Sequence, residues 1–197
     1  MEFQDVVRRR RMVRNFDSRP LPRDLVDRIV ANGLRAPSAG FTQGWAFVVL
    51  EGAEETSRFW SATFASAEAR AGFRWQGLFE APLLIVALSH KDAYLDRYAE
   101  ADKGWADRSE TRWPVAYWDI DAGFASLLMV LTAVDAGLGA LFFAVAEHDR
   151  FRAAFGVPGS YKPVGAVAVG YARPDEPSRS LQRGWKPSDA VVHRGRW

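Results

Sequence analysis

The sequence predicts a layered protein of helices and strands, in the α+β or mixed α/β class. Three segments carry this prediction. Residues 82–89, PLLIVALS, form a short unbroken apolar run, which is typical of a central strand covered on both faces. Residues 122–134, AGFASLLMVLTAV, are too few to span a bilayer and have aspartates close by, so they predict a wholly buried helix. Residues 22–36 repeat apolar side chains at helical spacing and predict an amphipathic helix.

The other elements are shorter and follow from composition and breakers. Loops are expected at 36–45, which holds Pro, Ser and two glycines in APSAGFTQG, and in the polar tail from Arg173. The aromatic and charged residues of 90–117 show no clear period and predict an irregular excursion that is a candidate lid. The remaining predicted helices are 3–10, 53–70, 117–135 and 147–155, and the remaining predicted strands are 45–52, 139–146 and 163–172.

Composition bounds the function classes. The 197 residues have no internal repeat and no linker, so we expect one domain over 1–197. The absence of cysteine excludes disulfides, thiolate metal sites and a cysteine nucleophile. The three histidines are far apart in sequence, and no metal site is expected. The N-terminus lacks the apolar core of a secretory signal, so we expect a cytoplasmic protein without a membrane partner.

Four adjacent arginines at 8–11, followed by Arg14, are the most unusual local feature. A bound phosphate, nucleic acid and a membrane surface are all possible partners, and so is solvent alone. The net charge is only +2, from 26 basic and 24 acidic residues, which argues against a nucleic-acid binder. For Arg8 and Arg9 we favour solvated cations that complement the end of a helix.

The order of five motifs identifies a family resemblance. These motifs are RRRMVRNF, APSAGFTQGW, the apolar helix with its GLG turn, GAVAVGYARPD and QRGWKPSDAVV. In this order and spacing the chain resembles the FMN-dependent nitroreductase superfamily over almost its whole length. The resemblance implies a central, mostly antiparallel sheet flanked by helices, in an intertwined homodimer. It also implies FMN as cofactor and NADH or NADPH as co-substrate.

The resemblance assigns roles by position. Arg10 and Arg11 would meet the phosphate, for which a guanidinium fork is well suited. Arg14 would lie near N1 and O2 of the flavin ring, where a cation stabilises the reduced form. The loop at 36–45 would complete the neighbouring subunit's site. The full implied cofactor site is Arg10, Arg11, Met12, Arg14, Pro37, Ser38, Ala39, Phe41, Gln43, Leu141, Phe142, Phe143, Arg183 and Lys186.

Three positions depart from the family pattern. Met12 stands in place of a serine, Phe41 in place of the loop asparagine, and Gly44 in place of a proline. The asparagine normally offers a side-chain hydrogen bond to the flavin. Phe41 can only stack or fill space.

The activity implied is transfer of hydride from NAD(P)H through flavin N5 to an electron-poor small molecule, in a ping-pong cycle. A nitroaromatic, a quinone and an enone are candidate acceptors. No side chain need act as a nucleophile, because the flavin carries the chemistry. Two alternatives stay open: a flavin- or deazaflavin-binding protein without fast turnover, and a nucleic-acid binder that uses the arginine run.

Overall fold

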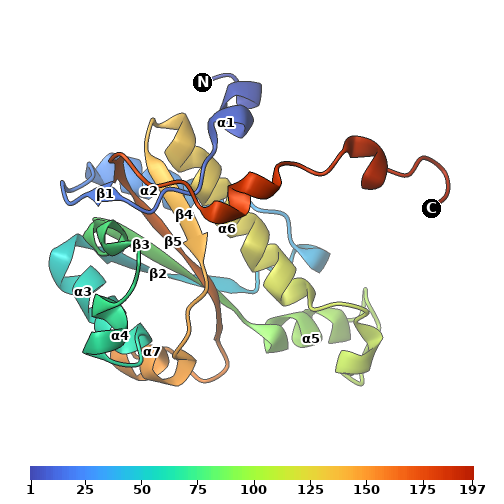
Figure 1. Cartoon of the computed structure of the whole chain (residues 1–197). Coiled ribbons are helices and arrows are strands. Elements are labelled where there is room, and N and C mark those ends of the chain that lie inside the picture. The colour runs from blue at the N-terminus through green and yellow to red at the C-terminus, as the bar shows by residue number, and fades with distance from the viewer.

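Five antiparallel strands form the centre of the fold in the computed structural model, which describes all residues from Met1 to Trp197 (Figure 1). β3 (Leu83–Ser89) lies between β2 (Trp45–Glu51) and β5 (Lys162–Ala172). β5 also pairs with β4 (Gly139–Phe143) and, beyond it, with the short β1 (Phe16–Asp17). The prediction of an α+β fold with a mostly antiparallel sheet is confirmed.

The apolar run at 82–89 is the central strand, as predicted. All seven residues of β3 are buried, and alternate side chains point to opposite faces of the sheet. Leu83 and Ile85 join one core cluster, whereas Leu84 and Val86 join the other. Both faces of the sheet are therefore covered, which explains why the strand has no polar position before Ser89.

Helices cover each face. α2 (Arg23–Gly33) and α6 (Tyr117–Asp135) pack on one face, and α3 (Gly52–Thr63) and α7 (His148–Phe155) on the other. A Cβ on Gly33 would come within 2.2 Å of Met129 Cε, so glycine lets α2 lie close against α6. The short α1 (Phe3–Arg9) packs on α6 through buried Val6.

Two predicted elements are shorter than expected. The helix predicted at 53–70 ends at Thr63, and a separate α4 spans Ala67–Ala71. Phe64 is extended, and the Ser66 side chain accepts the Ala69 N–H, which starts the second helix. The strand predicted at 139–146 ends at Phe143, where its pairing with β5 stops.

The prediction of an irregular segment at 90–117 is wrong in its first part, because α5 (Lys91–Ala99) is a regular helix. Tyr94, Leu95 and Tyr98 lie on its inner side, a helical spacing masked by the surrounding charges. The rest of the segment folds around Trp113, whose ring centroid is 4.5 Å from that of Tyr98 and 5.5 Å from that of Trp105. A role as a lid stays a prediction.

The expectation of a wholly buried helix also needs correction. α6 spans 117–135 as predicted, but only its inner side packs on the sheet, through Met129, Val130 and Ala133. Its outer side leaves large apolar side chains 37% to 48% exposed, and these are Tyr117, Ile120, Phe124 and Leu127. By length and composition α6 is long enough to cross a membrane, yet 56% of its apolar window is buried within the protein, which is typical of a core helix.

The C-terminal segment leaves the body of the protein after β5. Figure 1 shows residues after about 180 extending away from the sheet and helices. This part contains two short 3-10 turns, Arg179–Arg183 and Ser188–Ala190, and every residue from Arg179 onward is exposed.

Candidate functional site

An apolar cavity of about 450 Å3 lies where the end of β4 faces the segment that joins α3 to β3. Eleven of its 14 lining residues are hydrophobic, and the two charged ones are Arg14, from the N-terminal arm (residues 10–15), and Glu147. The lining residues are Arg14, Thr63, Phe64, Ala65, Ala69, Phe73, Trp75, Leu78, Leu141, Phe142, Phe143, Ala144, Ala146 and Glu147. This set contains four of the residues predicted from the sequence, namely Arg14, Leu141, Phe142 and Phe143.

Backbone pairing brings the N-terminal arm to β4. Met12 forms a parallel bridge with Ala140, and the Val13 N–H donates a 3.0 Å hydrogen bond to the Ala140 carbonyl. Val13 is buried beneath the arm, so the next residue, Arg14, points to the cavity. The side chain of Met12 packs against the core, where the serine of the family pattern would offer a hydroxyl.

Arg14 places an available positive charge in the cavity wall. Its guanidinium lies 5.0 Å from the ring centroid of Trp75, and its Nη1 donates a 3.1 Å hydrogen bond to the Met12 carbonyl. The backbone N–H of Arg14 donates to Asp175 Oδ2 at 2.7 Å, which fixes the arm. No carboxylate forms an ion pair with the guanidinium, so its charge remains free to meet an anionic ligand.

Aromatic rings form the walls of this cavity. Phe143 stacks on Trp60 with centroids 5.4 Å apart and planes 21° apart, and Phe64 and Phe73 meet edge to face. The indole N–H of Trp75 is buried and has no hydrogen-bond partner. The indole N–H groups of Trp60 and Trp113 are buried and unpaired in the same way. Flat aromatic walls and one cation suit a planar heteroaromatic ligand.

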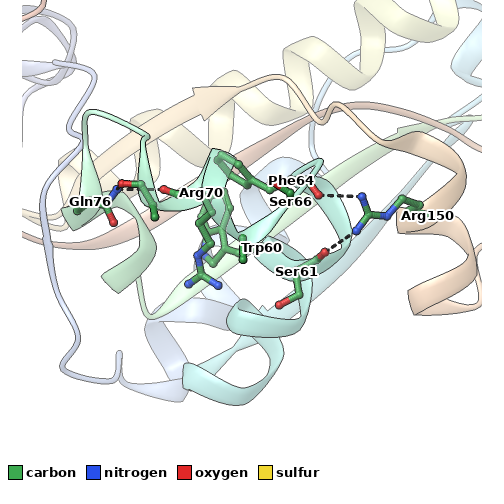
Figure 2. A pocket seen from close by; sticks show the side chains of 9 residues that line it. Trp60, Ser61, Phe64, Ser66, Arg70, Gln76 and Arg150 are labelled. Carbon is green, nitrogen blue, oxygen red and sulfur yellow. Dashed lines mark hydrogen bonds between the residues drawn. The ribbon is translucent and has the colours of Figure 1, made fainter.

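A second cavity, of about 500 Å3, lies behind the same wall between α3, α4 and α7. Figure 2 shows that two of its polar side chains, Arg150 and Gln76, form hydrogen bonds with the backbone. Arg150 donates to the carbonyls of Phe64 and Ser61 at 2.8 and 2.9 Å, and Gln76 donates to the carbonyls of Arg70, Ala71 and Phe73. These bonds close the ends of α3 and α4. We therefore interpret this cavity as a structural joint that holds Phe64 in the wall of the first cavity.

The loop at 36–45 does not line the apolar cavity of its own chain. It packs instead on α5 and α6, where Asp121 Oδ2 accepts the Ala39 N–H at 2.9 Å and Arg97 Nε donates to the Gly40 carbonyl at 3.0 Å. Ser38 Oγ accepts the Gln43 N–H at 3.0 Å, and Pro37 and Phe41 are exposed. A role of these residues in the neighbouring subunit's site stays a prediction.

The remaining predicted cations are dispersed in the single chain. Arg10 is half-buried at the end of α1 and Arg11 is exposed. Arg183 and Lys186 are exposed in the extended tail, which the body holds only as far as Glu176, through Arg74. The chain alone does not bring the two ends together, so the proposed phosphate clamp also stays a prediction.

Sequence reasoning missed the wall formed by Phe64, Phe73 and Trp75. These residues lie in a segment interpreted as a continuous helix or left without an element. The spacing of aromatic residues between 64 and 79, in a stretch otherwise rich in Ala, Gly and charge, was the signal that could have indicated it. No group of three or more His, Asp or Glu is placed to hold a metal ion.

Comparison with known proteins agrees with this geometry. The model of the nitroreductase family matches residues 7–171. The chain belongs to the nitroreductase family. The match includes the arm, the loop at 36–45, four whole strands and all but the last residue of β5, and it ends before the tail that holds Arg183 and Lys186.

Two relatives of known name match most of the chain. A 5,6-dimethylbenzimidazole synthase of Rhodospirillum rubrum is 29% identical over 192 residues, covering 90% of this chain and 85% of that protein. An NADPH-dependent oxidoreductase of Staphylococcus aureus is 25% identical over 195 residues, covering 98% of this chain and 73% of that protein.

Two solved structures of nitroreductase family members share the fold. A nitroreductase family protein of Clostridium difficile superposes with a TM-score of 0.73 at 19% identity, covering all of both chains. An FMN-dependent nitroreductase of the same species has a TM-score of 0.68 at 19% identity, covering 98% of each chain.

Proposed function

We propose that the protein is an FMN-dependent oxidoreductase that takes electrons from NADH or NADPH and reduces an electron-poor small molecule. The observation that carries the proposal is the convergence of Arg14 and flat aromatic walls at the end of β4. Family membership and the names of the relatives support a flavin oxidoreductase. The proposed acceptor is a nitroaromatic, a quinone or an enone, the proposed electron donor is NADH or NADPH, and the proposed location is the cytoplasm.

The residues present fit FMN. A cavity of about 450 Å3 is within the usual range of cofactor pockets, roughly 300 to 1,000 Å3. Its flat aromatic walls would accommodate the ring system, and Arg10 and Arg11, in the arm beside it, would offer guanidinium groups to a phosphate. When bound, FMN would supply hydride acceptance from the nicotinamide and hydride delivery to the acceptor.

The chain's own residues would position the rings and set the local charge. Arg14 would stabilise negative charge on the ring system near its guanidinium, because the surrounding aromatic walls lower the local dielectric. Phe64, Phe73 and Phe142 would exclude water from the ring faces. Backbone N–H groups of 141–143 that are not used in the sheet would orient the ring edge. No protein nucleophile is required.

The same proposal includes a homodimer that completes each site. The exposed apolar side chains of α6 recur at spacings of three and four residues, from Tyr117 through Ile120 and Phe124 to Leu127, so they form one stripe. An exposed apolar stripe of this kind marks an interaction surface. In a twofold pair of chains, the loop at 36–45 and the extended tail would reach the neighbouring chain's cavity. This arrangement accounts for why the single chain leaves both of them outside its own cavity.

Purification tests the proposal directly. The protein should be yellow and release FMN on denaturation, and NADH or NADPH should bleach the visible absorbance of the flavin. Addition of a quinone or a nitroaromatic should restore it. A protein that keeps its flavin oxidised in excess NADH and NADPH would favour the alternative of a flavin-binding protein without turnover. Absence of any bound flavin would contradict the proposal.

A further inference from the structure

Phe41 is the most exposed phenylalanine of the chain, with 78% of its surface accessible. An isolated exposed apolar residue is ordinary, but this one also has a left-handed backbone, with φ of +53°. That conformation is uncommon for a bulky residue and costs free energy. Within its own chain, the exposed ring of Phe41 gains no burial that would offset this cost. We therefore look for a role of the ring in contact with another molecule.

Hydrogen bonds within and around the loop hold the backbone of Phe41 at the surface. The buried carboxylate of Asp121 accepts the Ala39 N–H, and Arg97 grips the Gly40 carbonyl. The Phe41 N–H itself donates to the Ser38 carbonyl at 3.0 Å. Gly40, with φ of +61°, lies so close to Tyr98 that a Cβ would come within 2.7 Å of its ring. After Phe41, the Thr42 hydroxyl donates to the Ala39 carbonyl and the Gln43 N–H donates to Ser38 Oγ, so the backbone is held on both sides of Phe41.

We propose that Phe41 is a specificity-determining residue of the neighbouring subunit's site. Its ring would pack against the outer face of a flat, electron-poor aromatic acceptor and would favour such acceptors over those without a ring. An aromatic pair of this kind contributes beyond the area it buries, which corresponds to about a two- to ten-fold preference. The inference rests on the proposed function, because it needs both a flavin site and a second chain.

Three variants separate the ring from the loop. Phe41→Tyr keeps an aromatic face, Phe41→Leu keeps apolar volume, and Phe41→Asn removes the ring while tolerating a left-handed backbone. Each FMN-loaded variant is reduced with NADPH and mixed in stopped flow with menadione, a naphthoquinone, or with ferricyanide, which has no ring. Menadione affinity for the oxidised protein is measured separately from fluorescence quenching.

We expect the ratio of the rate constants for menadione and ferricyanide to fall about two- to ten-fold in Phe41→Leu and Phe41→Asn, with a matching loss of menadione affinity. Phe41→Tyr should keep the ratio of the wild type. Equal ratios in all four proteins would overturn the inference, and so would weaker FMN binding or loss of the dimer in step with the ratio. A wild-type protein that binds no FMN would instead overturn the proposed function, and this inference with it.

Discussion

The Tyr94 hydroxyl donates a 2.8 Å hydrogen bond to Asp121 Oδ2, and both side chains are buried. The same carboxylate oxygen accepts the Ala39 N–H, so one buried acid joins α5, α6 and the loop at 36–45. A buried carboxylate is tolerable only while its donors are present. The loop that we expect to complete the neighbouring site is therefore held by a polar contact inside the core.

Removal of the hydroxyl in Tyr94→Phe should lower the free energy of unfolding by about 1 to 3 kcal/mol at neutral pH, because Asp121 loses a buried donor. Urea unfolding measures the change. Tyr117→Phe is the matched control, since Tyr117 is 37% exposed on α6. An equal loss in both variants would contradict the role given to the buried pair.

The Tyr94 hydroxyl should also make the free energy of unfolding depend on pH in the alkaline range. Burial, aided by the hydrogen bond to Asp121, raises the pKa of Tyr94 far above its ordinary value of 10.0. The folded state therefore holds this proton more strongly than the unfolded state. Its contribution to stability is complete below about pH 10 and is lost as the pH rises further. The stability gap between the wild type and Tyr94→Phe should narrow between pH 10 and 11.5, and an unchanged gap would contradict it.

Arg14 and Arg183 should differ in what they control. Arg14→Ala should slow reduction by NAD(P)H about ten- to hundred-fold, because a partly buried charged hydrogen bond is worth roughly 1.5 to 3 kcal/mol. Arg183→Ala should weaken FMN affinity and leave the reduction potential nearly unchanged, since it is expected at the phosphate. Stopped-flow reduction and an FMN titration of both variants measure this. Identical profiles would contradict the separation of ring-facing and phosphate-facing arginines.

Much of the fold could be predicted from the sequence because its helices and strands have strong local sequence patterns. The central strand is a continuous apolar run, and α2 has clear helical spacing up to Gly33. The break after Thr63 was not predictable in the same way. Ser66 is a local capping signal for α4, but Arg150, which donates to the last carbonyls of α3, lies 86 residues from Phe64. No short window of sequence contains that second contact.

The sequence predicted only the part of the candidate site in which the N-terminal arm pairs with β4. Arg14 and residues 141–143 meet because the arm bridges to β4, which follows from the order of the motifs. Trp75 and Phe73 carry no sequence motif, and they reach the cavity only because α3 ends early. Phe41 was recognised as a departure from the family pattern, but its exposure and left-handed backbone required the structure.

Arg150 should stabilise both the protein and its cofactor site. Arg150→Ala removes two hydrogen bonds to the end of α3, and we expect a loss of about 1 to 2 kcal/mol in the free energy of unfolding. FMN affinity should fall as well, because Phe64 would no longer be held in the cavity wall. Arg179→Ala, at an exposed position of the tail, is the control for loss of charge. Unchanged FMN affinity in Arg150→Ala would show that the contacts of Arg150 do not support the wall of the FMN cavity.

The exposed stripe of α6 gives the sharpest test of the dimer. Leu127 is 48% exposed and lies in the middle of the helix, between Phe124 and Leu131. In a twofold pair each chain presents the same patch, so Leu127→Glu would introduce two like charges and remove two apolar contacts at once. A fully buried leucine contributes roughly 1.5 to 3 kcal/mol, and two copies would raise the dissociation constant of the dimer about a hundred-fold or more.

Sedimentation and an FMN titration together measure the consequence. Leu127→Glu should sediment as a folded monomer at micromolar concentration and bind FMN much more weakly, because the loop at 36–45 and the tail would no longer reach a neighbouring cavity. Ser57→Glu adds the same charge on exposed α3, on the opposite side of the sheet, and should keep the dimer and its flavin. A monomeric Leu127→Glu that still holds FMN as tightly as the wild type would show that each chain has a complete site. In that case the loop and the tail have no part in flavin binding, and Phe41 has no neighbouring site to enter.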